Sequence, residues 1–144
     1  MKRYYIILLV AVLFAACDNR TVFTEFHTLP LSGWNADSAL VFNVEMSDTA
    51  GLYDVIIDVR HAVNYPYQNM WLFVNNDTID FYLANQRGEW LGNGGGDLRE
   101  MPVLYKQAVR FDSVGTYTYT IIQGMRDKNL KGISDVGLQV VRHE

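Results

Sequence analysis

The sequence predicts an all-β protein, an antiparallel β-sandwich of about eight strands with jelly-roll or Ig-like Greek-key topology. Apolar residues occupy every second position in several runs, which is typical of strands with one face on a core. Clusters of Asn, Asp, Ser and Gly separate these runs, and such clusters form turns. No segment after Cys17 keeps an apolar period of 3.6 residues for long, so helices have little support.

The first element along the chain is a secretory signal. Lys2 and Arg3 precede thirteen uncharged residues, a run shorter than the roughly 20 that a membrane-spanning helix needs. Small residues then precede Cys17, the only cysteine, as in a bacterial lipobox whose thiol is acylated before cleavage. We therefore expect a lipoprotein signal peptide at 1–16, lipidation of Cys17 and a lipid-anchored tether at 17–21. The alternatives are an ordinary signal peptide with an incidental cysteine and a buried N-terminal helix.

Four stretches in the first half of the folded part predict strands. Residues 40–46 and 53–59 alternate apolar and polar side chains, with a turn-like stretch between them. Residues 70–74 are continuously apolar, which predicts a central strand covered on both faces. Asn75-Asn76-Asp77 predicts a tight turn into a further strand at 79–83.

The second half predicts further short strands at 90–91, 109–111, 117–121 and 138–140. Residues 126–131 are the best candidate for a helical turn. The stretch 112–117 resembles a tyrosine corner, in which a tyrosine hydroxyl bonds to the backbone where the chain crosses between sheets. Because no disulfide can form in the core, stability must come from the burial of large apolar side chains. We expect these to include Phe42, Trp71, Phe81, Trp90 and Tyr119.

Composition and charge argue against several classes of function. The formal net charge is −4, with 12 basic and 16 acidic residues, so no basic field attracts nucleic acid. His27, His61 and His143 lack the spacing of a metal site, and one cysteine cannot form a multi-cysteine zinc site. No G-x-S-x-G elbow occurs. We expect no cofactor and no catalysis, and we expect a single β-sandwich domain at 22–144.

The most unusual segment surrounds Pro66. Two tyrosines and two amide side chains lie there, just ahead of the apolar run at 70–74. Flat aromatic faces together with directional amides suit a sugar or a peptide, and an ordered loop packed over the sandwich end is the alternative. The sequence therefore suggests a possible binding surface, whose residues are Tyr65, Tyr67, Gln68, Asn69 and Trp90.

An enzymatic hypothesis is a hydrolase that uses carboxylates from two strands. Asp58 and Asp80 are the candidates, because carboxylates from neighbouring strands can converge. This hypothesis requires both carboxyl groups to lie close together in one cleft.

Several blocks of the sequence resemble one family, the gliding-motility-associated GldH lipoproteins of Bacteroidetes. The blocks are the lipobox at Cys17, Gly33-Trp34 with Asp37-Ser38, and residues 65–73, 88–92, 125–127 and 130–138. The resemblance covers nearly the whole chain. It implies an envelope lipoprotein needed for gliding and linked to the motility and type IX secretion apparatus, and it implies no catalytic residue.

From the residues and the resemblance together we expect a non-enzymatic lipoprotein. Its lipid binds the membrane, with the outer membrane favoured over the inner one, and its partners are other motility or secretion proteins of the envelope. The alternative is a carbohydrate-binding lipoprotein module that uses the loop aromatics to bind a glycan.

Overall fold

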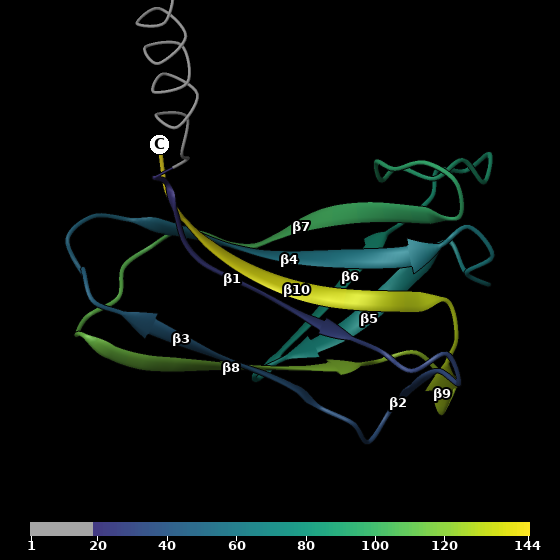
Figure 1. Ribbon diagram of the computed structural model, residues 1–144, viewed down its shortest axis with the longest axis horizontal. Coiled ribbons are helices and arrows are strands. Elements are labelled where there is room, and N and C mark those ends of the chain that lie inside the picture. The colour runs from purple at the N-terminus through teal and green to yellow at the C-terminus, as the bar shows by residue number, and fades with distance from the viewer. Residues whose placement is uncertain (1–18) are drawn as a thin grey trace, which may run out of the picture.

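The computed structural model describes residues 19–144, and these form an all-β protein with no helix among them (Figure 1). Residues 1–18, including Cys17 and the predicted signal peptide, lie outside the described part. The strands are β1 (Thr21–Thr28), β2 (Trp34–Asn35), β3 (Leu40–Met46), β4 (Tyr53–Ala62), β5 (Asn69–Val74), β6 (Asp77–Tyr82), β7 (Leu98–Val109), β8 (Gly115–Gln123), β9 (Asn129–Leu130) and β10 (Ile133–Arg142). No helix within residues 19–144 has the length and hydropathy to span a membrane.

Two four-stranded antiparallel sheets make up the sandwich. One has the order β1-β10-β4-β7, the other has the order β3-β8-β5-β6, and β2 and β9 form a short separate ladder. Among the eight long strands, the first pairs with the last, the second with the seventh, the third with the sixth and the fourth with the fifth. This nested pairing is that of a jelly roll. The predicted sandwich is confirmed, and of its two topologies the jelly roll is the one observed.

The core lies between the sheets, and the period-two runs explain which side chains enter it. In β3 and β4 every second residue is buried, from Leu40 to Met46 and from Tyr53 to His61. Sequence reasoning correctly expected Phe42 in this core, whereas Trp34 was not among the expected core residues. The tyrosine corner is also confirmed, because Tyr117 Oη donates to the carbonyl of Ser113 at 2.8 Å.

Four expectations about single elements are wrong. The expected strand at 90–91 is absent from the described residues, where Trp90 makes only an isolated bridge with Ala84. The run at 70–74 forms the central strand β5, but its outer face is uncovered, so Trp71 is 41% and Phe73 43% exposed. Residues 126–131 form a loop and β9 instead of a helical turn. Strand β7 starts at Leu98, well before the predicted strand at 109–111. Pro102 obscured it, and an edge strand tolerates proline because one of its sides makes no ladder.

The two ends of the sandwich differ in what they carry (Figure 1). The start of β1 and the end of β10 lie together at one end, where Thr21 pairs with Val141. The long connection between β6 and β7 lies at the opposite end, as does the β2–β9 ladder. The described chain therefore begins at the end of the sandwich that is remote from these loops.

Candidate functional site

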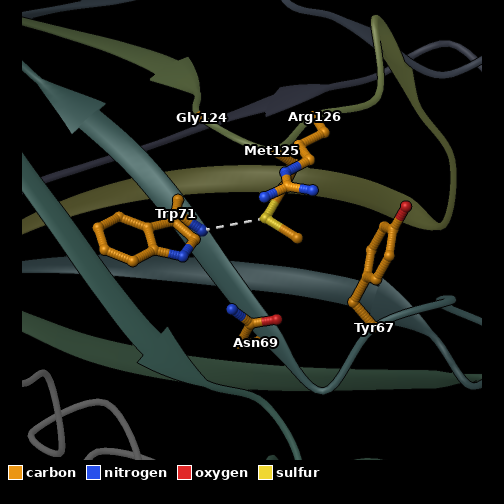
Figure 2. A pocket seen from close by; sticks show the side chains of 6 residues that line it. All are labelled: Tyr67, Asn69, Trp71, Gly124, Met125 and Arg126. Atoms are coloured by element: carbon orange, nitrogen blue, oxygen red, sulfur yellow. Dashed lines mark hydrogen bonds between the residues drawn. The ribbon is translucent and has the colours of Figure 1, made fainter.

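A pocket of about 570 Å³ opens at the loop-bearing end, beside β5. Six residues line it: Tyr67, Asn69, Trp71, Gly124, Met125 and Arg126. Figure 2 shows Tyr67 and Asn69 opposite Met125 and Arg126, which belong to the loop after β8, and the Trp71 indole beside them, directed away from Met125. The pocket thus joins two segments that are more than fifty residues apart in the sequence.

The pocket exists because sheet pairing stops early on one side of β5. Strand β8 pairs with β5 only from Leu72 to Val74, and the chain then diverges after Gly124 donates its N–H to the Trp71 carbonyl at 2.7 Å. The Trp71 N–H donates to the Met125 thioether at 3.3 Å, in place of a ladder carbonyl (Figure 2). A side chain at position 124 would lie 3.1 Å from the Phe73 ring and 3.2 Å from Trp71 Cβ, so glycine keeps this space open.

Buried Gln123 fixes the loop that forms one wall of the pocket. Its Nε2 donates to the carbonyl of Asp127 at 2.7 Å and to that of Trp34 at 3.3 Å. Its Oε1 accepts the Met125 N–H at 2.8 Å. One amide side chain therefore ties the two ends of the turn at 125–127 to the core.

Tyr67 fixes the same loop from the other side. Its Oη donates to Asp127 Oδ1 at 2.6 Å, and this hydrogen bond to the carboxylate raises the pKa of Tyr67 above its usual value. The Tyr67 ring also packs edge-on against Tyr65, with 5.9 Å between ring centroids. The pocket is therefore held in shape by contacts within the protein.

The outer face of the β3-β8-β5-β6 sheet carries uncovered aromatic rings. Trp71 and Phe73 project from β5, and Tyr82, which pairs with Asn69 across the ladder, is 66% exposed on β6. On the other sheet the outward-facing Phe26 ring is covered, because the Arg60 guanidinium lies 3.9 Å above its centre. Exposed aromatic surface beside a pocket is typical of a binding face.

The five residues of the predicted binding surface lie in three places. Tyr67 and Asn69 line the pocket described above. Gln68 lines a neighbouring cavity of about 420 Å³ together with Tyr82 and Leu91. Tyr65 and Trp90 belong to a different environment.

Tyr65 is buried, and its Oη donates to the carbonyl of Asn69 at 2.9 Å. Burial raises the pKa of Tyr65 above its usual value, so its hydroxyl stays protonated. Half-buried Trp90 packs against His61, with 4.6 Å between ring centroids. These two rings support the loops and leave little aromatic surface for a ligand.

Sequence reasoning did not identify Trp71, Met125 and Arg126 as site residues. Trp71 lay in a run interpreted as covered on both faces, and Arg126 lay in the predicted helical turn. The available signal was the block at 125–127, which resembles the same family as the block at 65–73 and meets it in the pocket.

His61 is buried at the end of β4 and contacts the core. Its Nδ1 donates to the carbonyl of Ala62 at 2.9 Å, while its Nε2 has no hydrogen-bond partner in the structure. Burial lowers the pKa of His61 and favours the neutral ring. Among residues 19–144, no three His, Cys, Asp or Glu side chains are grouped so that they could hold a metal ion.

The carboxylates of the hydrolase hypothesis lie on opposite outer faces of the sandwich. Asp58, on β4, is buried beside Gln139, whose amide donates to it, and burial raises the pKa of Asp58. Asp80 is exposed on β6 in the other sheet, opposite Trp71 in the ladder. Because the core separates them, the hypothesis of an Asp58–Asp80 hydrolase is wrong.

Comparison with known proteins identifies relatives over almost the whole chain. The profile of the family described as GldH lipoprotein matches residues 21–140. A protein named gliding motility lipoprotein GldH homolog, from Christiangramia forsetii, is 31% identical over 97% of this chain and 95% of its own length. Gliding motility lipoprotein GldH from Flavobacterium johnsoniae is 32% identical over 97% of this chain and 96% of its own length. No solved structure matches the chain.

Proposed function

This chain belongs to the GldH lipoprotein family, and we propose that it supports the gliding-motility or type IX secretion machinery through protein–protein contacts. Family membership supports a motility-related lipoprotein that is lipid-anchored in the cell envelope. The proposal adds three finer points. The lipid is attached to Cys17, the outer membrane is the favoured location, and the protein is an adaptor without catalytic activity.

The observation that carries this proposal is the position, in the fold, of three segments that resemble the GldH family. Residues 65–73, 88–92 and 125–127 all contribute to the two pockets at the loop-bearing end. The described chain begins at the other end (Figure 1). A ten-residue strand such as β4 spans about 33 Å at ~3.3 Å per residue. A tether at 17–21 then directs these segments away from the membrane and towards partners.

The anchor is tested by Cys17→Ser in the cells that express the protein. We expect the variant to leave the membrane fraction, because the acyl chains at Cys17 are the proposed membrane anchor, and we expect gliding or type IX secretion to fail. The N-terminal peptide of the wild-type protein should carry acyl chains when it is measured by mass spectrometry. Normal membrane partitioning and normal function of Cys17→Ser contradict the anchoring part of the proposal.

The adaptor role is tested by photo-crosslinking from two matched positions. Leu91, 49% exposed, lies at the loop-bearing end, and Val114, 66% exposed, lies between β7 and β8 at the tethered end. We expect a photoreactive residue at position 91 to capture envelope motility or secretion proteins, identified by mass spectrometry. Capture from position 114 alone, or from neither position, contradicts the proposed orientation.

A carbohydrate-binding module is the second candidate function. The preformed pocket beside Trp71 favours it, because a concavity of about 570 Å³ is of the size that small ligands occupy. This candidate does not require the protein contacts of the first.

A further inference from the structure

We propose that the pocket beside Trp71 binds a carboxylate-bearing saccharide. In this site Trp71 is the stacking platform, Arg126 binds the carboxylate and the Asn69 amide bonds to hydroxyl groups. The proposal rests on the second candidate function, that of a carbohydrate-binding module, and names its ligand class; it does not depend on the adaptor function.

The stacking platform of the proposed site is the indole of Trp71. Trp71 projects outward from β5, and its neighbour towards β8 is Gly124, which has no side chain to cover the indole. Asp80 is its ladder partner on β6. An exposed indole fixed on a central strand offers a rigid apolar face, and the C–H face of a sugar ring stacks on such a surface.

The positive charge of the proposed site comes from the Arg126 guanidinium. Arg126 is exposed, and it has no ion pair or hydrogen bond with other residues of the 19–144 region. The adjacent carboxylate, that of Asp127, is already held by Tyr67. A planar guanidinium beside an aromatic ring recognises a carboxylate through two parallel hydrogen bonds. The charge complementarity of the pocket therefore favours an acidic ligand over a neutral one.

The Asn69 amide is the group that would bond to the hydroxyls of a sugar. The side chain of Asn69 lies at the edge of the pocket and makes no hydrogen bond with another described residue (Figure 2). Its amide supplies two donors and an acceptor, which match the alternating donors and acceptors of sugar hydroxyls. Arg126 and Asn69 thus leave their hydrogen-bonding capacity to a ligand.

The size and shape of the pocket are fixed before a ligand binds. Gln123 and Tyr67 hold the wall of the pocket in place, so binding needs little ordering of the loop. A preformed concavity of about 570 Å³ suits one or two sugar units with an exposed platform for more. A flat protein–protein patch has no need of such a recess.

Two sources in a cell envelope supply this ligand chemistry: polysaccharides that contain uronic acids, and cell-wall glycan whose N-acetylmuramic acid units have lost their stem peptides and expose the lactyl carboxylate. Isothermal titration of the full chain in detergent micelles separates them. The probes are trigalacturonate, the disaccharide of N-acetylglucosamine and N-acetylmuramic acid, and galactotriose as the neutral match to the first probe. We expect one acidic probe to bind at least roughly tenfold more tightly than galactotriose.

Variants assign the two roles. Trp71→Ala should weaken every bound probe roughly tenfold, whereas Arg126→Gln should remove only the preference for the acidic probe. Arg87→Gln is the matched control for charge, because Arg87 is exposed and pairs with Glu89 away from the pocket. Should Trp71→Ala not fold, as judged by circular dichroism, the exposed Arg126 carries the test.

Several results would overturn the proposal. These are the absence of binding of both acidic probes at millimolar concentration, equal affinity for acidic and neutral probes, and an unchanged preference in Arg126→Gln. An effect of Arg87→Gln equal to that of Arg126→Gln points to unspecific electrostatic attraction and also overturns it. Failure of the crosslinking test above leaves these results unaffected, so the two proposals fail separately.

Discussion

Replacing Gln123 with alanine tests how the pocket is held together. Gln123 is buried and makes three hydrogen bonds, to the carbonyls of Asp127 and Trp34 and from the N–H of Met125. Each lost bond costs about 1 kcal/mol, and buried partners left without a bond add to this. We expect Gln123→Ala to lower the free energy of unfolding by about 3 kcal/mol, a large part of the stability of a small domain.

Urea denaturation at pH 7, followed by tryptophan fluorescence, measures this loss. With a slope of about 2 kcal/mol per molar urea, the midpoint should fall by about 1.5 M. Hydrogen exchange should also accelerate at the amides of residues 125–128, because the loop loses its attachment to the core. Gln107→Ala, at an exposed position of β7, is the control. A loss below about 1 kcal/mol, or equal losses in both variants, refutes the view that Gln123 organises the pocket.

Three further predictions concern single buried or bonded groups. Burial lowers the pKa of His61, so the unfolded chain binds more protons, and the free energy of unfolding should fall as the pH drops below about 6.5, by at most about 1.4 kcal/mol per pH unit. Urea midpoints between pH 7.5 and pH 5 check this. An equal dependence of the midpoint on pH in His61→Phe contradicts it. Burial raises the pKa of Asp58, so Asp58→Asn should stabilise the protein at pH 7 and lose this advantage as the pH falls towards 4; equal midpoints at pH 7 speak against it. Tyr117→Phe removes both hydrogen bonds to Ser113 and should cost about 1–2 kcal/mol in thermal unfolding, whereas exposed Tyr82→Phe should cost less than about 0.5 kcal/mol.

The fold class was predictable from the sequence because local patterns encode it. In β3 and β4 the alternation of apolar side chains follows directly from burial of one strand face. The tyrosine corner was predictable too, since Tyr117 and Ser113 are close in sequence. The nested pairing that makes the jelly roll joins strands whose separation grows from a hairpin, β5 with β6, to more than one hundred residues, β1 with β10, and no local pattern specifies the long-range pairs.

The candidate site was predicted only in part. Tyr67 and Asn69 were expected at a binding surface, and both line the pocket. Trp71 was assigned to the core because a continuous apolar run is the same for a strand covered on both faces and for a strand that exposes aromatic rings on one. Arg126 reaches the pocket through the attachment of its loop by Gln123, a tertiary contact that sequence spacing cannot indicate.

The placement of β1 at the edge of its sheet has a mechanical consequence. Seven residue pairs join β1 to β10, and the chain enters this ladder at Thr21, next to the proposed tether. A pull between a lipid at that end and a partner at the opposite end runs parallel to the strands. The rungs between β1 and β10 then share the load in shear, instead of opening one after another as in peeling. In the proposed lipid-anchored orientation, detachment of the edge strand by such a pull requires many bonds to break together.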